Sequence, residues 1–210
     1  MSISVLCVTR GERHAPRFLQ HFALVASFLR AELVIARDRC DIVVAGAKTI
    51  DVDCSACPMI ETVLKEAVAA CSGDWILRLD DDETVSLAML GCLLAADLSG
   101  YEAVGFPRAH LWGDERTMLT NPDYWPDTQM RFSKREWAVR RTLHEAPPRM
   151  DCVAPGCLLH HVYLVRDREA RRETAERYCR IQGVPMQDPP RYWPSDYLYV
   201  ATIPAGDGAI

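Results

Sequence analysis

The fold follows from one stretch of the chain, which reads Trp75-Ile76-Leu77-Arg78-Leu79-Asp80-Asp81-Asp82-Glu83. Its mostly apolar first part is typical of a buried β-strand, because large aliphatic and aromatic side chains suit a covered, pleated surface. The four acids that follow repel one another, and a divalent cation is their simplest counter-charge because hard cations prefer oxygen ligands. Open α/β sheets bind ligands beyond the carboxyl ends of their strands, so the acids predict a site at that edge. The alternative is a solvated acidic turn that caps the next helix.

The composition describes a globular protein with one ordinary domain and an appendage. The chain has 210 residues, of which 49% are hydrophobic and 25% are charged, so a sizeable core can form. The formal net charge of -5 argues against a protein that coats nucleic acid. No apolar run approaches the roughly 18 residues of a membrane helix, and the N-terminus lacks the basic segment of a signal peptide.

The cysteines indicate a reducing compartment. They are scattered, odd in number and mostly embedded in apolar segments, which favours buried free thiols and a cytoplasmic location. Cys54 and Cys57 have the spacing of a zinc or redox pair, but no second Cys or His pair follows at the distance of a zinc finger. A structural zinc site is therefore disfavoured.

Alternating apolar segments predict an α/β layered fold with parallel strand pairing. We expect strands at residues 3–8, 32–36, 41–45, 75–79, 103–106, 129–133, 138–140 and 158–164. We expect helices at residues 14–30, 58–71, 87–96 and 167–181. Residues 107–126 should form a long loop, and its aromatic residues favour a functional role. The tail after Gly183 is rich in Pro and Tyr, so it should be extended and packed on the domain or on a neighbouring molecule.

Two other acidic motifs can be compared with the same stretch. A calcium loop that begins at Asp80 would need Gly and Glu where the chain has Val85 and Gly91, so that interpretation fails. Asp80, Asp82, Thr84 and Val85 spell the Asp-x-Asp-x-Thr-Val motif of haloacid-dehalogenase phosphatases, in which Asp80 is a nucleophile and Asp82 a general acid/base. That motif normally lies on the first strand, whereas three predicted strands precede it here. The phosphatase stays a less favoured alternative.

The same acidic stretch is part of a longer sequence resemblance, which covers most of residues 1–180. Residues 70–83 resemble the A-x-G-D-W-I-L-x-L-D-x-D-E stretch of glycosyltransferase family 2. Three more landmarks follow in the family's order: Gln129-Met130-Arg131-Phe132, Leu143-His144-Glu145 and Leu159-His160-His161. Four landmarks in order are more specific than a lone Asp-x-Asp motif. The resemblance implies a GT-A (Rossmann-like) α/β fold, with a mixed, mostly parallel central sheet flanked by helices, a C-terminal helix and an extended tail.

The resemblance also implies a metal-dependent transferase that moves a sugar from a nucleotide diphosphate to an acceptor, with inversion. Side chains two apart in an extended segment face the same way, so Asp80 and Asp82 can share one ion while Asp81 points away. Asp82 would bind Mn²⁺ or Mg²⁺ directly, with Asp80 on the ribose or on a metal-bound water. His160 would be the late metal ligand, and His161 is the less favoured choice. The metal would neutralise the departing diphosphate.

Inversion also needs a carboxylate that takes the acceptor proton, and Glu145 is the expected base, with Asp127 in reserve. The residues expected to contact the nucleotide sugar are Asp38, Thr9, Arg10, Asp80, Arg131 and His144. The N-terminal half departs from the family's pattern, so uridine diphosphate is only the default nucleotide. We expect residues 1–165 to form the catalytic domain, with a charged helix and a Pro- and aromatic-rich tail at 166–210 packed on it.

The acceptor stays open between a saccharide, a lipid, a peptide, a small molecule and a modified nucleic acid. Aromatic residues of the 107–126 loop and of the tail would line the acceptor pocket. The tail is also a candidate surface for a homo-oligomer. The rival to an enzyme is a non-catalytic module that binds a sugar nucleotide or a glycan and keeps the same fold.

Overall fold

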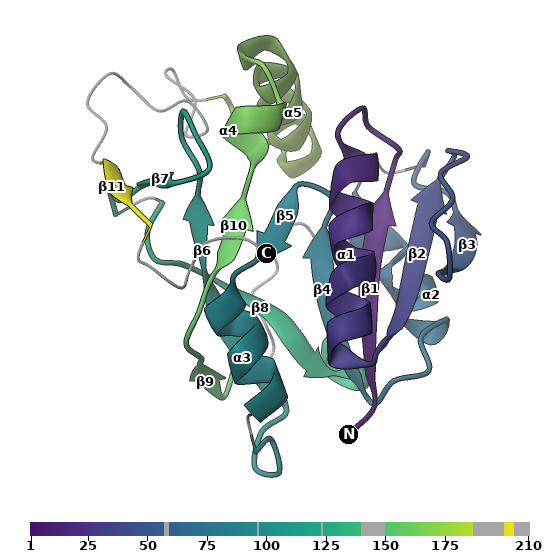
Figure 1. Cartoon of the computed structure of the whole chain (residues 1–210). Coiled ribbons are helices and arrows are strands. Elements are labelled where there is room, and N and C mark those ends of the chain that lie inside the picture. Colours follow the sequence, from purple (N-terminus) through teal and green to yellow (C-terminus); the bar gives the residue numbers. More distant parts are fainter. Residues whose placement is uncertain (57–58, 96, 123, 140–149, 187–199, 204–210) are drawn as a thin grey trace.

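The computed structural model describes residues 1–56, 59–95, 97–122, 124–139, 150–186 and 200–203 (Figure 1). Within these residues, nine strands form one sheet in the spatial order β3-β2-β1-β4-β8-β6-β10-β5, with β9 paired to β6. The strands are β1 (Ile3–Thr9), β2 (Glu32–Asp38), β3 (Lys48–Val52), β4 (Trp75–Asp80), β5 (Glu83–Val85), β6 (Ala103–His110), β8 (Asp127–Lys134), β9 (Cys152–Val153) and β10 (Leu158–His160). Antiparallel pairs join β4 to β8, β8 to β6 and β10 to β5, and the other pairs are parallel.

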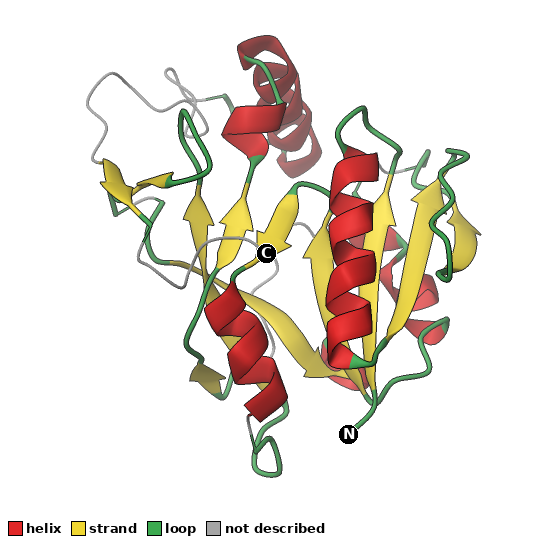
Figure 2. Cartoon of the chain, in the orientation of Figure 1, coloured by secondary structure: helices red, strands yellow, loops and turns green. Residues whose placement is uncertain are grey.

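Helices cover both faces of this sheet (Figure 2). The helical segments are α1 (Ala15–Leu29), η1 (Ile60–Thr62), α2 (Leu64–Ala69), α3 (Leu87–Ala95), η2 (Arg135–Trp137), α4 (Val162–Val165) and α5 (Arg168–Gln182). α1 and α3 pack on one face, where Phe18, Leu77 and Met89 belong to one core cluster. α2 packs on the other face, where Leu64 and Ile76 belong to a second cluster. The predicted α/β fold with a mixed, mostly parallel, Rossmann-like sheet is confirmed, and it is consistent with the GT-A arrangement.

The third strand of the N-terminal half lies later than predicted. Residues 41–45 form a loop, so the strand prediction there is wrong, and β3 forms at Lys48–Val52, where no strand was predicted. Ile42 and Val44 nevertheless pack against the core. β3 pairs in parallel with β2, and that backbone ladder defines the strand although only Val52 of its side chains is buried.

Three predictions in the C-terminal half also need correction. The expected 107–126 loop instead contains the end of β6 and strand β7 (Thr117–Leu119), which pairs with β11 (Val200–Thr202). The expected strand at 158–164 stops after His160, because the His161 N–H donates to the Asp82 carbonyl and α4 begins at Val162. Residues 138 and 139 lie after a 3-10 turn instead of in a strand, and residue 140 lies outside the described part.

α5 is the C-terminal helix that the sequence predicted. The Asp167 carboxylate caps it by accepting from the Ala170 N–H, and Gly183 ends it with φ of 66°. Ala175 is its one buried residue, so the helix lies on the surface of the body. The predicted division after residue 165 stays a prediction, as does self-association through the tail, most of which lies outside the described residues. No helix in the described part is long and apolar enough to span a bilayer.

Candidate functional site

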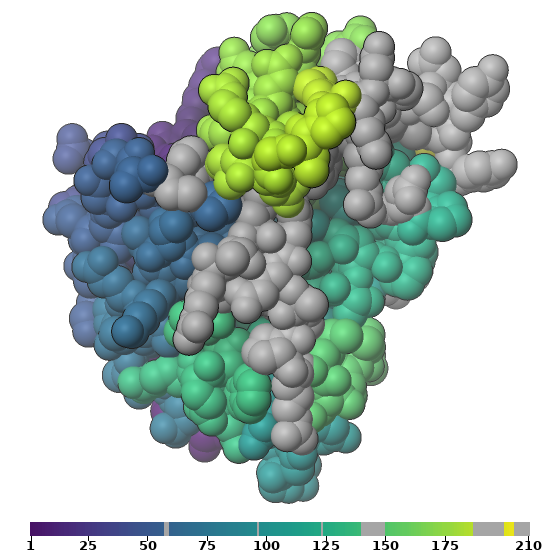
Figure 3. Space-filling model, turned by 180° about the vertical axis from the view of Figure 1, so that it is seen from behind, coloured from purple at the N-terminus to yellow at the C-terminus, as the bar shows by residue number. Residues whose placement is uncertain are grey.

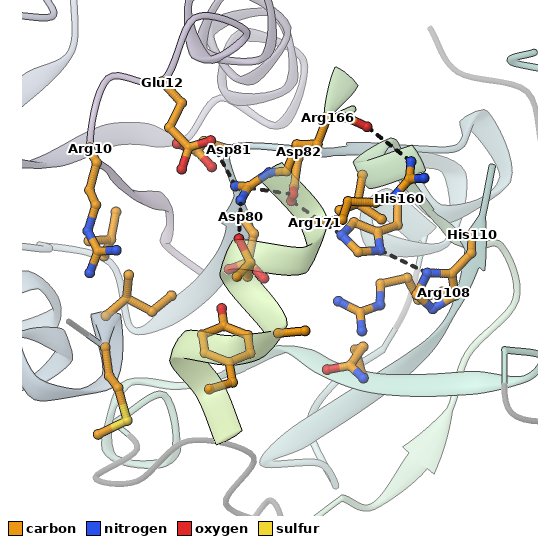
Figure 4. A pocket seen from close by; sticks show the side chains of 18 of the residues that line it. Arg10, Glu12, Asp80, Asp81, Asp82, Arg108, His110, His160, Arg166 and Arg171 are labelled. Atoms are coloured by element: carbon orange, nitrogen blue, oxygen red, sulfur yellow. Dashed lines mark hydrogen bonds and ion pairs between the residues drawn. The ribbon is translucent and has the colours of Figure 1, made fainter. Parts of the chain in front are cut away.

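A cavity of about 260 Å³ opens where the strands β1, β4 and β10 end (Figure 4). Acidic side chains reach it from β4 and the turn that follows, and histidines reach it from β6 and β10. Its wall is rich in arginine: Arg10, Arg78, Arg108, Arg131, Arg166, Arg171 and Arg177. The predicted acidic edge of the sheet is thus one wall of a cavity with both signs of charge, which suits a ligand carrying phosphate and polar groups.

α5 forms the opposite wall of this cavity. Arg171, Thr174, Ala175, Arg177 and Tyr178 repeat at helical spacing and line it together with the strand ends. In the view from behind, the yellow-green surface of α5 lies between blue residues of the N-terminal half and teal residues of the β6–β8 region (Figure 3). The cavity therefore lies between the sheet and its last helix.

Asp80 faces Arg131, as side-chain alternation along β4 and β8 requires. Arg131 Nη2 donates to the Asp80 carboxylate, and it also donates to Glu83 Oε1 at 2.6 Å. Burial opposes the charge on Asp80, but the guanidinium lowers the pKa of this carboxyl. Glu83 is fully buried and also accepts from Arg108 Nη1 at 3.2 Å, so it links β5 to β6 and β8.

Asp82 faces a different set of partners. Its Oδ1 lies 3.5 Å from His160 Nε2, and its Oδ2 lies 3.9 Å from Arg166 Nη2. Burial opposes ionisation, but His160 and then Arg166 hold the pKa of Asp82 below its usual range. Asp80 and Asp82 line one cavity, but they have separate partners, and their sharing of one ion stays a prediction.

Asp81 lies closer to the cavity than the sequence suggested. It lines the wall, and its Oδ2 accepts a hydrogen bond from Thr9 Oγ1 at 2.6 Å. Burial, and next the charge of Asp82, raise the pKa of Asp81 to about 7. The Thr9 hydroxyl also accepts from the Gly11 N–H at 3.0 Å, so Thr9 holds the loop after β1 against Asp81. Thr9 itself is not a lining residue.

Two further residues of the N-terminal half, Arg10 and Asp38, were expected to contact the nucleotide, and of these two Arg10 lines the cavity. Arg10 lines the cavity and donates from Nε to Asp38 at 3.0 Å. Asp38 is buried behind it and accepts also from Arg39 Nε at 2.9 Å and from the Cys54 N–H at 3.1 Å. Although burial opposes it, these bonds hold the pKa of Asp38 at about 2. Asp38 thus orients Arg10 and does not line the cavity.

Asp127, the reserve base, is engaged by three side chains. Its Oδ2 accepts from Arg108 Nη2 at 2.6 Å and lies 3.1 Å from His110 Nε2, while its Oδ1 accepts from Gln129 Nε2 at 2.6 Å. Burial opposes its ionisation, but His110 and Arg108 hold the pKa of Asp127 below its usual range. Such a carboxylate is a poor proton acceptor, because general bases work best with a pKa near the working pH.

Several functional candidates came from the structure alone. Arg108 and His110 line the cavity on β6, which the sequence assigned to a loop from residue 107. Arg78 Nη1 and Glu61 Oε2 are buried at the cavity without a hydrogen-bond partner among the described residues. Strand alternation could have identified Arg78, which lies two residues before Asp80 and on the same face of β4, whereas Glu61 lies in a 3-10 turn that has no such pattern.

The structure gives no placement for two of the predicted site residues and places His161 away from the metal-binding position. His144 and Glu145 lie outside the described residues, so their roles stay predictions. His161 is buried, and its Nε2 lies 2.9 Å from Thr84 Oγ1. Its ring also packs edge-on against Phe18. This environment gives His161 a structural place and leaves His160 as the histidine beside Asp82.

A metal ion would find two protein ligands here. Within the described residues, no three His, Cys, Asp or Glu side chains are grouped to hold a metal ion. Asp82 and His160 approach each other at 3.5 Å, whereas Asp80 is bound to Arg131. Mg²⁺ is usually bound through one or two carboxylates, with phosphate and water as its other ligands, and a neutral imidazole is a common metal ligand. The pair therefore fits such an ion in the presence of a phosphate ligand.

No protein-family model matches the chain, and no curated protein matches its sequence. Among solved structures it is similar to S. aureus TarS, with 15% identity, a TM-score of 0.44 and coverage of 65% of this chain and 29% of that one. A glycosyltransferase involved in the glycosylation of the major capsid of PBCV-1 has 14% identity, a TM-score of 0.44 and coverage of 88% and 100%. A 4-diphosphocytidyl-2C-methyl-D-erythritolsynthase from Anaerococcus prevotii has 12% identity, a TM-score of 0.36 and coverage of 64% and 72%. This chain spans less than a third of TarS, so the function has to be argued from the site.

Proposed function

We propose that this chain is a GT-A glycosyltransferase of the family 2 type, which transfers a sugar with inversion from a nucleotide diphosphate to an acceptor. The observation that supports this most is the pairing of Asp82 with His160 at the carboxyl end of β4, beside the arginines of one cavity. The sequence landmarks around residues 70–83 and 129–132 support the same function. Uridine diphosphate is the first nucleotide to test.

The arginines would bind the phosphates of the donor. Arg166 contacts Asp82 and Glu12, and its Nε is buried without an acceptor among the described residues. A guanidinium held in this way has a free N–H for a phosphate oxygen, and charge-assisted bonds of this kind are strong. Arg131 holds Asp80 in the orientation that would receive a ribose hydroxyl or a bound water.

The metal would be Mn²⁺ or Mg²⁺ on Asp82 and His160, and when bound it would neutralise the diphosphate that leaves the sugar. The base that takes the acceptor proton is proposed to be Glu145, on the sequence landmark alone. Asp127 is the weaker candidate, because Arg108, His110 and Gln129 already occupy its oxygens. The acceptor, the cytoplasmic location and an oligomer stay open proposals.

The test is release of nucleoside diphosphate from a panel of nucleotide sugars with Mn²⁺, with water and a set of simple acceptors. We expect the wild type to release product from one donor and to stop releasing it when EDTA is added. Asp82→Ala should lower the rate by at least about a hundredfold, which corresponds to roughly 2.7 kcal/mol. Asp97→Asn is the matched control, because that carboxylate is exposed and, among the described residues, bonds to the neighbouring Ser99 N–H and does not line the cavity.

Three outcomes would overturn this proposal. Full turnover in Asp82→Ala would remove the metal assignment. Binding of nucleotide sugars without turnover of any of them would favour the binding module. Hydrolysis of simple phosphomonoesters with a phosphoaspartate trapped at Asp80 would favour the phosphatase. NMR of the product's anomeric proton separates inversion from retention.

A further inference from the structure

A line of four side chains ends at Asp82, and Figure 4 shows its last three members, His110, His160 and Asp82, in the cavity. Asp127 Oδ2 lies 3.1 Å from His110 Nε2. His110 Nδ1 lies 2.9 Å from His160 Nδ1. His160 Nε2 lies 3.5 Å from Asp82 Oδ1. Both imidazoles are thus held at each of their two nitrogens, and the carboxylates stand at the two ends of the line.

The partners of His110 fix where its proton lies. Nε2 faces a carboxylate oxygen, which only accepts, so the hydrogen bond requires a proton on Nε2. Arg108 already donates to the same carboxylate, and His110 is buried, so a second cation there is disfavoured. A neutral His110 with its proton on Nε2 has a lone pair on Nδ1 and can only accept there.

The tautomer of His160 follows from that of His110. Two Nδ1 atoms at 2.9 Å share one proton, and His110 accepts, so His160 must donate from Nδ1. His160 Nε2 faces the Asp82 carboxylate, and an ion bound between them would take the place of a proton on Nε2. Two acceptors that face each other need a cation between them, and a metal ion satisfies both.

We propose that Asp127 and His110 are positioning residues of the metal site, which hold His160 in the tautomer that leaves Nε2 free for the ion. This inference rests on the metal of the proposed function. It gives Asp127 a role other than catalytic base, and it gives His110 a role that the sequence did not suggest. Partners behind a metal-ligating histidine orient the ring, and their loss typically lowers metal affinity 10- to 100-fold.

The competing arrangement has a proton where the metal would lie. Nε2 would then keep its proton and pair with Asp82 even when Mn²⁺ is supplied, so that no ion binds between them. In that case, removal of the His110 acceptor would not change Mn²⁺ affinity, because the wild type itself would bind no Mn²⁺. The two arrangements are therefore separated by direct metal binding, without reference to turnover.

The experiment measures Mn²⁺ affinity of the full chain by electron paramagnetic resonance, with Mn²⁺ alone and with Mn²⁺ plus UDP. His110→Phe removes the acceptor for His160 and should weaken Mn²⁺ binding about 10- to 100-fold. His110→Gln keeps a carbonyl that can accept from His160 and an amide that can donate to Asp127, so it should stay within about threefold of the wild type. Asp127→Asn should weaken binding in the same direction as His110→Phe. His21→Gln is the control, because His21 is a buried histidine that accepts from the Val85 N–H outside the cavity.

A second measurement reads the proton positions directly. Long-range ¹H–¹⁵N NMR with UDP and a Mg²⁺ concentration that saturates the wild type should show His160 with its proton on Nδ1 and none on Nε2 in the wild type and in His110→Gln, but not in His110→Phe. Absence of Mn²⁺ binding by the wild type, equal affinity of all variants, or a His160 protonated on both nitrogens would each overturn the inference. If Mn²⁺ binding behaves as expected but no donor turns over, the proposed function fails and the metal site stands. If turnover depends on Mn²⁺ while the His110 and Asp127 variants bind it normally, the inference fails alone.

Discussion

The guanidinium of Arg131 lies against the carboxylate of Asp80, and the same Nη2 donates to Glu83. Arg131 is 3% exposed, so one buried cation from β8 holds two of the four consecutive acids at the end of β4. Its pKa is held above its usual value, because the two carboxylates outweigh the effect of burial. Asp80 and Glu83 are therefore held by Arg131, whereas Asp82 faces the cavity with other partners.

Arg131→Met should lower the free energy of unfolding by about 3–5 kcal/mol, because it leaves Glu83 and Asp80 without their main counter-charge. Arg131→Lys keeps the charge in a different shape and should cost less. Urea unfolding of the ligand-free chain measures both. The control is Arg172→Met, because Arg172 is exposed and pairs with Glu176 one turn along α5, where a loss within about 0.5 kcal/mol is expected. Equal losses at positions 131 and 172 would contradict the buried pair.

Arg78 should favour ligand binding at the expense of stability. Its Nη1 is buried without an acceptor in the described part of the chain, and burial, followed by the charge of Arg131, lowers the pKa of Arg78. Arg78→Met should therefore raise the free energy of unfolding of the ligand-free chain by roughly 1–2 kcal/mol. It should also weaken UDP binding about tenfold, because a cavity donor is lost.

Urea unfolding and calorimetric titration with UDP measure the two effects separately. Arg135→Met is the matched control, because Arg135 donates to the Gly73 carbonyl and does not line the cavity. That variant should lose stability and keep its UDP affinity. If the Arg78→Met variant loses stability and binds UDP normally, Arg78 supports the fold and not ligand binding.

Local patterns of apolar residues predicted most of the helices and strands of the sheet, including β4. The apolar run before Asp80 reads as a buried strand, because Ile76 and Leu77 pack on opposite faces of the sheet. The strand predicted at residues 41–45 was wrong because it, too, was inferred from local apolar residues alone. Ile42 and Val44 have strong strand propensity, but they contact the core from a loop, and β2 pairs with the more polar β3 instead.

Local spacing identified only the part of the site whose residues lie close together in the sequence, and the family resemblance added Arg131 and His160, which line the same cavity. Asp80 and Asp82 follow from their spacing on β4, whereas their different partners come from β8 and β10. His110 was hidden because polar residues after Phe106 read as a loop, although β6 continues between β8 and β10. Pairing on both sides of a strand is a tertiary property, which no local pattern contains.

His21 gives a prediction for pH. It accepts from the Val85 N–H at 3.2 Å, and burial, followed by the charge of Arg17, lowers the pKa of His21 to about 4. Between about pH 6.5 and pH 4 the unfolded chain binds a proton that the folded chain does not bind, so stability should fall as the pH is lowered through this range. A shift of this size corresponds to about 3 kcal/mol.

His21→Gln keeps a carbonyl that can accept from Val85 and does not titrate, so its unfolding free energy should fall less on acidification. Urea unfolding at a series of pH values between about 7 and 4 compares the variant with the wild type. Other histidines contribute equally to both chains, and the difference between the two curves isolates His21. Parallel curves would show that the buried ring carries no such penalty.

Two glycines should respond in opposite ways to an added methyl group. Gly91 lies inside α3, and a Cβ there meets no atom within 4 Å, so Gly91→Ala should raise stability by about 0.5–1 kcal/mol. Gly156 has φ of +89°, and a Cβ there would lie 2.2 Å from the Met89 backbone N, so Gly156→Ala should cost at least about 2 kcal/mol. Gly156 is followed by β10, which carries His160, so Gly156→Ala should also weaken Mn²⁺ binding, whereas Gly91→Ala should not. Unfolding and Mn²⁺ titration of the two variants test whether the close approach of residue 156 to α3 fixes the position of β10.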